Sequence, residues 1–231
     1  MRGLIIGAGE VGNSLMEVLS KEYETDLWDI RYVGKIPTSA EILHICFPYC
    51  DDFIEQVKTY KDIIKPKHIV IHSTVPIGTC SDLECVHSPI VGIHPHLEKS
   101  LKTFIKFLGG CGASGVANYF RRAGMKVYVT DKSETTELCK IQSTNFYALC
   151  IEFFKDMKNQ CTKQGVPFEF WTLWNQNYNT GYNQLGYSEY TRPNLIPIMT
   201  KQGGHCTLPN LEFLDSEFTR FLKEVTLPKS I

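Results

Sequence analysis

Residues 2–12 read RGLIIGAGEVG, an apolar run that gives way to three glycines. Apolar residues then recur at Leu15, Met16 and Leu19, which is the spacing of an amphipathic helix. The stretch therefore predicts a buried strand, a tight glycine turn and a helix in direct succession.

The glycines Gly7, Gly9 and Gly12 have the spacing GxGxxG. In such a unit the first glycine permits the tight turn, the second lets the backbone approach a pyrophosphate, and the third lets the helix pack on its strand. The N–H groups of Glu10 and Val11 lie at the predicted helix N-terminus, where the helix dipole favours an anion. The turn is thus a candidate dinucleotide-binding site.

An acidic residue follows at the distance that this motif requires, about 20 residues further on. The segment TDLWD, residues 25–29, has the form of a short strand that ends in Asp29. A carboxylate there accepts hydrogen bonds from the adenosine ribose and repels a 2′-phosphate, which favours NAD over NADP. Arg31 close by weakens that preference. The alternative interpretation is a structural turn with an incidental aspartate.

The composition indicates a globular chain. Its 231 residues suffice for one large domain or for a standard domain with a smaller appendix. The hydrophobic content of 43% argues against disorder, and the formal net charge of −1 argues against nucleic acid as a partner. No apolar run approaches the roughly 20 residues of a membrane span. Nine cysteines without a CxxC pair are typical of reduced residues, so we expect a soluble, cytoplasmic protein without a signal peptide or a membrane partner.

Strand patterns alternate with helical patterns up to about residue 130. The strand patterns cover residues 41–48, 68–76, 86–94, 106–110 and 126–130, and the helical patterns cover residues 51–60 and 115–123. This α/β alternation predicts a doubly wound parallel sheet, an NAD-binding Rossmann domain over residues 1–130. Ser73 and Thr74 fall at the end of a strand, where an open sheet places its ligand crevice, so we expect them to face the nicotinamide half of the cofactor.

The second part of the chain has a helical period. From Ser133 apolar residues recur at three- and four-residue steps, which predicts one long helix ending at residues 165–167. A second helix follows through residues 170–174, and residues 175–194 are expected to form a substrate-facing loop or a surface loop. Residues 131–231 are thus predicted to form a small helical domain for substrate binding. The long apolar stripe exceeds what one small sheet can cover, which favours a homodimer.

Residues 203–206 read GGHC and stand before another helical pattern over residues 211–222. Glycines directly before a cysteine permit close approach of a ligand, and a helix N-terminus favours the thiolate form. The sequence therefore singles out Cys206 as a candidate nucleophile.

The GGHC segment resembles the nucleophile segment of the UDP-glucose/UDP-N-acetylmannosamine dehydrogenase family, in the 6-phosphogluconate dehydrogenase-like superfamily. Three further stretches support the resemblance, in the order of the family. Residues 72–79, HSTVPIGT, resemble its STVPPGT strand end, and residues 136–140, TELCK, resemble the start of its central helix. Phe47 and Pro48 resemble its VP turn, which lies near the cofactor.

The resemblance implies an NAD-dependent oxidation of an alcohol to an acid. Hydride would leave the substrate carbinol for NAD, and Cys206 would attack the resulting aldehyde to give a thiohemiacetal. A second hydride transfer would give a thioester, which water hydrolyses. Lys140 would stabilise the developing alkoxide by its charge.

The chain departs from the family at two catalytic positions. Thr144 stands where the family has asparagine. Asn145, one place later and rotated about 100° around a helix, is the candidate for that catalytic role. Residues 88–90 read SPI where the family has SPE, so the glutamate that helps thioester hydrolysis is replaced. His94 and His96 nearby are candidates for acid/base function, as in the His-Pro segment of prephenate dehydrogenases, or are turn histidines. They have no third ligand close in sequence, so no metal is expected.

The length of the chain also differs from the family, whose members carry a further domain for the nucleotide of the sugar. We expect a truncated form that acts on a small-molecule substrate such as a sugar or a nucleotide sugar. Either the substrate is smaller than a UDP-sugar, or a second chain completes the site, or activity is lost. The alternatives are a one-step prephenate- or hydroxyacid-type dehydrogenase that uses His94 or Lys140, and a catalytically silent NAD-binding module.

Overall fold

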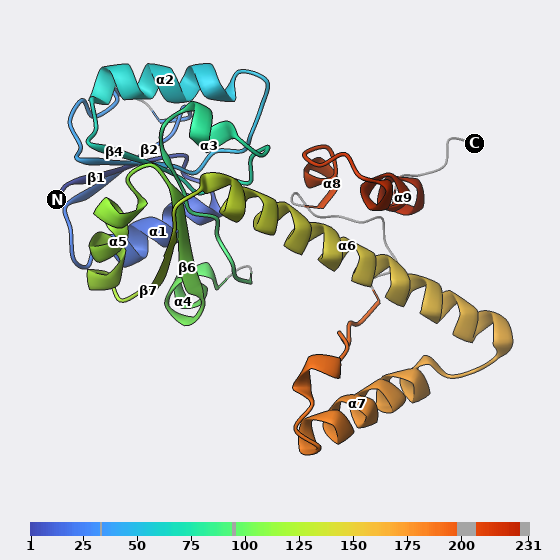
Figure 1. Cartoon of the computed structure of the whole chain (residues 1–231). Coiled ribbons are helices and arrows are strands. Elements are labelled where there is room, and N and C mark those ends of the chain that lie inside the picture. The colour runs from blue at the N-terminus through green and yellow to red at the C-terminus, as the bar shows by residue number, and fades with distance from the viewer. Residues whose placement is uncertain (33, 94–95, 198–206, 227–231) are drawn as a thin grey trace. The chain divides into compact units, whose positions relative to one another are not determined.

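The computed structural model describes residues 1–32, 34–93, 96–197 and 207–226. The chain divides into two compact units, Met1–Ile141 and Gln142–Ile231 (Figure 1). The first unit is built from a sheet and helices, and the second is helical. Among the described residues, no helix combines the length and apolar character needed to cross a bilayer.

In the described residues, the first unit holds a seven-stranded sheet with the order β2-β1-β3-β4-β5-β6-β7. Neighbouring strands pair in parallel, except that β5 and β6 pair antiparallel. The predicted doubly wound α/β fold is confirmed, with this one pair as a difference. The strands are β1 (Gly3–Ile6), β2 (Thr25–Trp28), β3 (Ile42–Ile45), β4 (His68–Ile71), β5 (Val86–His87), β6 (Ile105–Gly110) and β7 (Lys126–Thr130).

The antiparallel pair follows from the segment between β5 and β6. The strand predicted over residues 86–94 ends at His87, because Pro89 has no N–H group to donate to a neighbouring strand. Helix α4, Leu97–Thr103, has seven residues and spans only about 10 Å. A parallel return needs an element that carries the chain back along the sheet, so the chain re-enters the sheet in the opposite direction.

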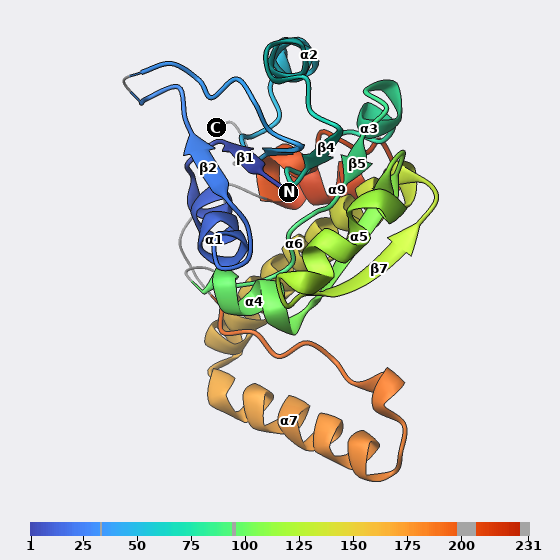
Figure 2. The ribbon, with the colours of Figure 1, turned by 90° about the vertical axis from the view of Figure 1, so that its left-hand side faces the viewer.

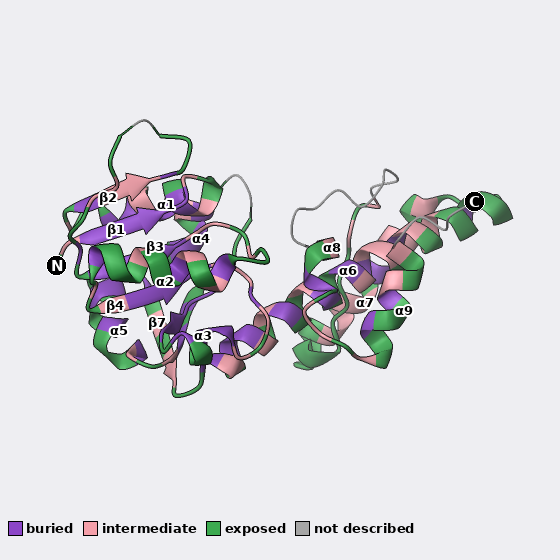
Figure 3. Cartoon of the chain, turned by 90° about the horizontal axis from the view of Figure 1, so that it is seen from above, coloured by how far each residue is buried: buried purple, intermediate pink, exposed green. Residues whose placement is uncertain are grey.

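Helices cover both faces of the sheet (Figure 1 and Figure 2). One face carries α1 (Glu10–Leu19), α4 and α5 (Ala113–Arg122), and the other carries α2 (Phe53–Ile64) and α3 (Thr79–Asp82). Strand β1 explains the continuous apolar run of the sequence, because Ile5 packs into the first core while Leu4 and Ile6 pack into the second. The inner strands are accordingly buried (Figure 3).

The long helix predicted from Ser133 is confirmed as α6, Ser133–Gln164. It ends before Gly165, whose φ of 67° is left-handed and stops the helix. Its residues up to Ile141 belong to the first unit and the rest to the second. The second unit continues with α7 (Phe168–Gln184), a 3-10 turn η1 (Ser188–Tyr190), α8 (Thr207–Asn210) and α9 (Glu217–Thr226), so the pattern predicted over residues 211–222 is helical only in its second half.

The loop predicted over residues 175–194 is wrong up to Gln184, because α7 continues through it. Tyr178 and Tyr182 lie one helical turn apart with ring centroids 4.6 Å from each other, and Tyr182 also packs against Tyr190 at 5.4 Å. The Asn-rich composition reflects a different role. Asn179 exchanges two hydrogen bonds of 2.8 Å with the backbone of Arg192, which fastens the returning segment to the helix.

Candidate functional site

Two glycines of the β1–α1 turn are required by the fold itself. Gly7 has a φ of 104°, and a Cβ there would lie 2.9 Å from the backbone of Cys46 and Phe47. A Cβ on Gly12 would lie 1.9 Å from the carbonyl oxygen of Gly7. The first glycine therefore permits the turn and the close approach of β3, and the third permits α1 to pack against the turn.

Gly9 differs from its two neighbours in the motif. Its φ of −76° is open to any residue, and a Cβ there would meet no described atom within 4 Å. Gly9 is also the N-cap residue of α1, so no side chain caps the helix from this position. Neither backbone strain nor packing therefore requires glycine at this position. The missing side chain leaves open space beside the first N–H groups of α1, which have no hydrogen-bond partner within the helix.

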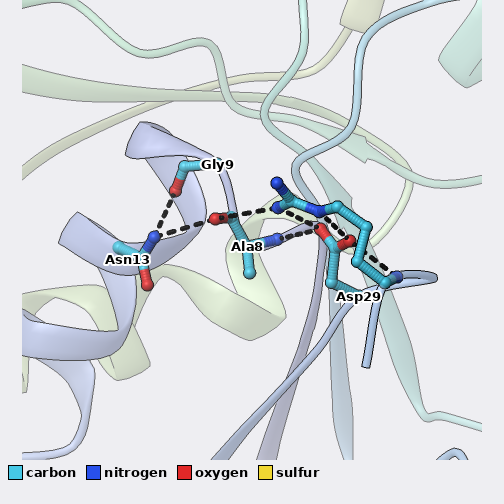
Figure 4. A network of polar contacts seen from close by, with 5 residues as sticks. Ala8, Gly9, Asn13 and Asp29 are labelled. Atoms are coloured by element: carbon cyan, nitrogen blue, oxygen red, sulfur yellow. Dashed lines mark hydrogen bonds and ion pairs between the residues drawn. The ribbon is translucent and has the colours of Figure 1, made fainter. Parts of the chain in front are cut away.

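Asn13 and Asp29 hold the turn from its two ends (Figure 4). The Nδ2 of Asn13 donates to the carbonyl oxygens of Ala8 and Gly9, both at 2.9 Å. The N–H of Ala8 donates to Oδ2 of Asp29 at 2.8 Å. The Ala8 and Gly9 carbonyl oxygens are thus held toward Asn13 of α1. Asn13 was not predicted from the sequence, although an asparagine directly after the third glycine was a usable signal.

Asp29 lies at the end of β2, as predicted, and is buried. Arg31 donates to Oδ1 of Asp29 through Nε at 2.7 Å and to Oδ2 through Nη2 at 3.1 Å. These hydrogen bonds, followed by those from the backbone N–H groups of Ala8 and Arg31, hold the pKa of the Asp29 carboxyl well below its usual range, against the opposing effect of burial. Asp29 is therefore a fixed, ionised acceptor beside the glycine turn.

The predicted residues after β3 and β4 lie at the same sheet edge, because the carboxyl ends of parallel strands meet there. Phe47 and Pro48 follow β3, and Ser73 and Thr74 follow β4. The Ser73 hydroxyl donates to the carbonyl oxygen of Phe47 at 2.5 Å, so this proton ties the two strand ends together. The ring of Phe47 packs on Phe53 with centroids 5.0 Å apart.

The first turns of α6 place Lys140 over the loop after β5. The buried carboxylate of Glu137 accepts the backbone N–H groups of Gly78 at 2.7 Å and Cys80 at 2.8 Å. One turn further on, Nζ of Lys140 donates to the carbonyl oxygen of Ile90 at 2.8 Å. Glu137 is part of the TELCK segment, but its anchoring role was not predicted: its two contacts join the helix start to the segment after β4 and thereby fix the cation at the sheet edge.

A chain of polar side chains, not predicted from the sequence, links buried residues of the sheet with Tyr119 of α5. His44 Nε2 lies 3.2 Å from the hydroxyl of Tyr119, and His44 Nδ1 lies 3.0 Å from His72 Nε2. Nζ of Lys106 lies 3.1 Å from His72 Nδ1 and donates to the carbonyl oxygen of Ser88 at 2.7 Å. Burial lowers the pKa of Lys106 to about 7 and that of His44 to about 3. Both groups are fully enclosed in the first unit.

Three predicted catalytic residues stand apart from this geometry. Cys206 and His94 lie outside the described residues, and their roles stay predictions. Asn145 lies in the second unit and is buried, and its Oδ1 has no hydrogen-bond partner among the described residues. A buried amide oxygen without a donor is costly, so Asn145 has the capacity to accept one more hydrogen bond.

No protein-family model matches the chain, and no curated protein matches its sequence. Solved structures match its fold, an α/β Rossmann-like sheet followed by a helical region. The UDP-D-ManNAc dehydrogenase from Pyrococcus horikoshii aligns with a TM-score of 0.72 at 16% identity, over 98% of this chain and 68% of that one. The UDP-N-acetyl-mannosamine dehydrogenase from Staphylococcus aureus gives 0.70 at 15% identity, over 98% and 67%.

A shorter protein aligns comparably. The 3-hydroxyisobutyrate dehydrogenase from Mycobacterium tuberculosis gives a TM-score of 0.69 at 10% identity, over 96% of this chain and 91% of that one. At these identities the likeness concerns the fold. The resemblance predicted from the GGHC, STVPIGT and TELCK segments is confirmed at that level.

Proposed function

We propose that the chain binds a nicotinamide dinucleotide at the β1–α1 turn and acts as an oxidoreductase on an alcohol. The observation that carries this proposal is the open space beside Gly9, between two glycines that the fold requires. The three solved structures compared above are described as dehydrogenases, which supports the same class of reaction.

The residues present fit such a cofactor. Gly9 and the N–H groups of Glu10 and Val11 would hold the pyrophosphate, because no Cβ fills the space and the helix dipole favours an anion. Asp29 would accept the adenosine ribose, which favours NAD, and its ionisation is already secured in the free protein. The residues at the sheet edge, Phe47, Pro48, Ser73 and Thr74, would border the nicotinamide. When bound, the nicotinamide would accept a hydride from the substrate or return it.

We assign to Lys140 the role of the cation that contacts the reacting oxygen of the substrate. Its ammonium group is held by the Ile90 carbonyl, and Glu137 fixes the turn of α6 from which it extends. A positive charge placed there stabilises a developing alkoxide. The finer proposal adds Cys206 as a covalent nucleophile and a sugar or nucleotide sugar as the substrate, on the strength of the GGHC segment.

A homodimer is also proposed. The second unit exposes several large apolar side chains on α6 and α7, namely Phe146, Phe153, Phe170, Leu173 and Trp174. Exposed aromatic and aliphatic side chains of this kind are typical of an interface between subunits.

Two matched alanine variants test cofactor binding. Gly9→Ala should keep its unfolding free energy within about 1 kcal/mol of wild type, because the added Cβ meets nothing, and should lose at least about tenfold in NAD affinity. Gly12→Ala should lose about 2 kcal/mol of stability from the clash with Gly7. Calorimetric titration with NAD measures affinity and urea unfolding measures stability. Wild-type affinity in Gly9→Ala would refute the proposed site.

A panel of alcohols, hydroxyacids and nucleotide sugars then tests turnover through the absorbance of the reduced cofactor. Lys140→Met should lower turnover by about 100-fold or more while NAD binding persists. Cys206→Ser should abolish acid formation if the covalent step exists and should leave a one-step dehydrogenase nearly intact. Ile90 in place of glutamate favours the silent NAD-binding module as the second candidate, and NAD binding without any turnover would support it.

A further inference from the structure

The Asp29 carboxylate is saturated with hydrogen bonds. Oδ1 accepts the backbone N–H of Arg31 at 3.1 Å and its Nε at 2.7 Å. Oδ2 accepts the N–H of Ala8 at 2.8 Å and Nη2 of Arg31 at 3.1 Å. A carboxylate offers about four lone-pair sites, so each one is in use. A ribose can therefore bind Asp29 only after one of these donors leaves.

The four donors differ in their freedom to leave. The two backbone N–H groups are fixed by the chain, whereas the Arg31 side chain is 68% exposed and can rotate into solvent. The guanidinium places one donor on each carboxylate oxygen, which is the arrangement that the two hydroxyls of a ribose would adopt. Its departure would leave one acceptor site on each oxygen, with the carboxylate still held by the backbone.

We propose that Arg31 is a specificity-determining residue that competes with the adenosine ribose for Asp29. Displaced from the carboxylate, its guanidinium remains beside the ribose position, where it can bind a 2′-phosphate through two charge-assisted hydrogen bonds. Arg31 thus lowers the affinity for NAD and raises that for NADP, so that the chain accepts both. This inference rests on the proposed dinucleotide site.

Calorimetric titration of the full chain with NAD and with NADP tests the inference, in wild type, Arg31→Ala and Arg31→Lys. Arg31→Ala should bind NAD about threefold more tightly, because an exposed ion pair is a weak competitor. It should bind NADP about tenfold more weakly, because a charge-assisted contact is lost. Arg31→Lys keeps the charge without the fork, so it should keep NADP affinity within about threefold of wild type.

Arg2→Ala is the matched control, because Arg2 forms the same kind of exposed pair with Asp26 at 2.8 Å and should leave both affinities unchanged. A second readout needs no cofactor. Carboxyl NMR should show that Arg31→Ala raises the pKa of Asp29, since the Arg31 side chain is the main cause of its lowering.

The two hypotheses fail differently. An NAD-to-NADP affinity ratio in Arg31→Ala within about twofold of wild type, with both cofactors still binding, would overturn the role of Arg31 alone. Failure of the wild-type chain to bind either nucleotide would overturn the dinucleotide site and this inference with it.

Discussion

Raising the pH from about 7 to about 9 is expected to stabilise the first unit, because Lys106 is buried in the core. Its pKa is about 7 in the folded chain against an ordinary value of 10.5. Between these values the unfolded state binds more protons than the folded state, so the free energy of unfolding increases with pH. One pKa unit corresponds to about 1.4 kcal/mol, and Lys106 is half protonated at pH 7, which gives a gain of about 2 kcal/mol by pH 9.

The buried histidines act in the acid range. The pKa of His44 is lowered to about 3 from 6.5, and burial also lowers the pKa values of His72 and His87. Each pKa is lower in the folded state, so each group costs stability as the pH falls from 6.5 toward its folded pKa. The unit should therefore be most stable on the alkaline side of neutrality.

Urea unfolding at several pH values measures the effect in wild type and in Lys106→Met. Trp28 reports on the first unit when Trp171 and Trp174 are replaced by phenylalanine in every variant. The wild-type free energy should rise by about 2 kcal/mol while that of Lys106→Met stays nearly level, and exposed Lys102→Met should follow wild type. Parallel curves for wild type and Lys106→Met would refute a buried, titrating lysine.

Three further outcomes are expected. Glu137→Gln should lower the free energy of unfolding by about 1–3 kcal/mol, because one of two backbone N–H groups would face an amide donor, and an unchanged urea midpoint would contradict the anchoring role. Asn13→Ala should weaken NAD binding about fivefold, because the turn loses the side-chain hydrogen bonds to the Ala8 and Gly9 carbonyls, whereas equal affinity by calorimetry would count against it. Sedimentation at micromolar concentration should show a dimer that Trp174→Glu dissociates, and a monomeric wild type would disprove the proposed interface.

The sequence was most informative where one local pattern determines the backbone. Gly7 is required by its positive φ, and Gly12 by its contact with the Gly7 carbonyl, so the local pattern was sufficient and the predicted strand, turn and helix are confirmed. The period of three and four residues likewise predicted α6. The α7 segment failed because its asparagines are typical of loops, while here Asn179 binds a distant backbone.

The buried polar chain had no local signal. His44 lies on β3, His72 directly follows β4, Lys106 lies on β6, and Tyr119 lies on α5. Their contacts depend on the register of β3 with β4 and on the packing of α5. The periodicity of apolar residues in the sequence predicts neither the register nor the packing. The direction of β6 was equally hidden, because it depends on how short α4 is.

In this buried chain of polar side chains, the position of one hydrogen determines the positions of the others. A charged Lys106 donates to Nδ1 of His72, which leaves the ring hydrogen on Nε2 facing His44, and His44 in turn donates from Nε2 to the oxygen of Tyr119. If Lys106 is neutral, His72 is free to donate from Nδ1 to the Ser88 carbonyl; in that arrangement both rings take the other tautomer and the Tyr119 hydroxyl donates to Nε2 of His44. The charge on Lys106 can thereby set the direction of the hydrogen bond at Tyr119 without moving any heavy atom.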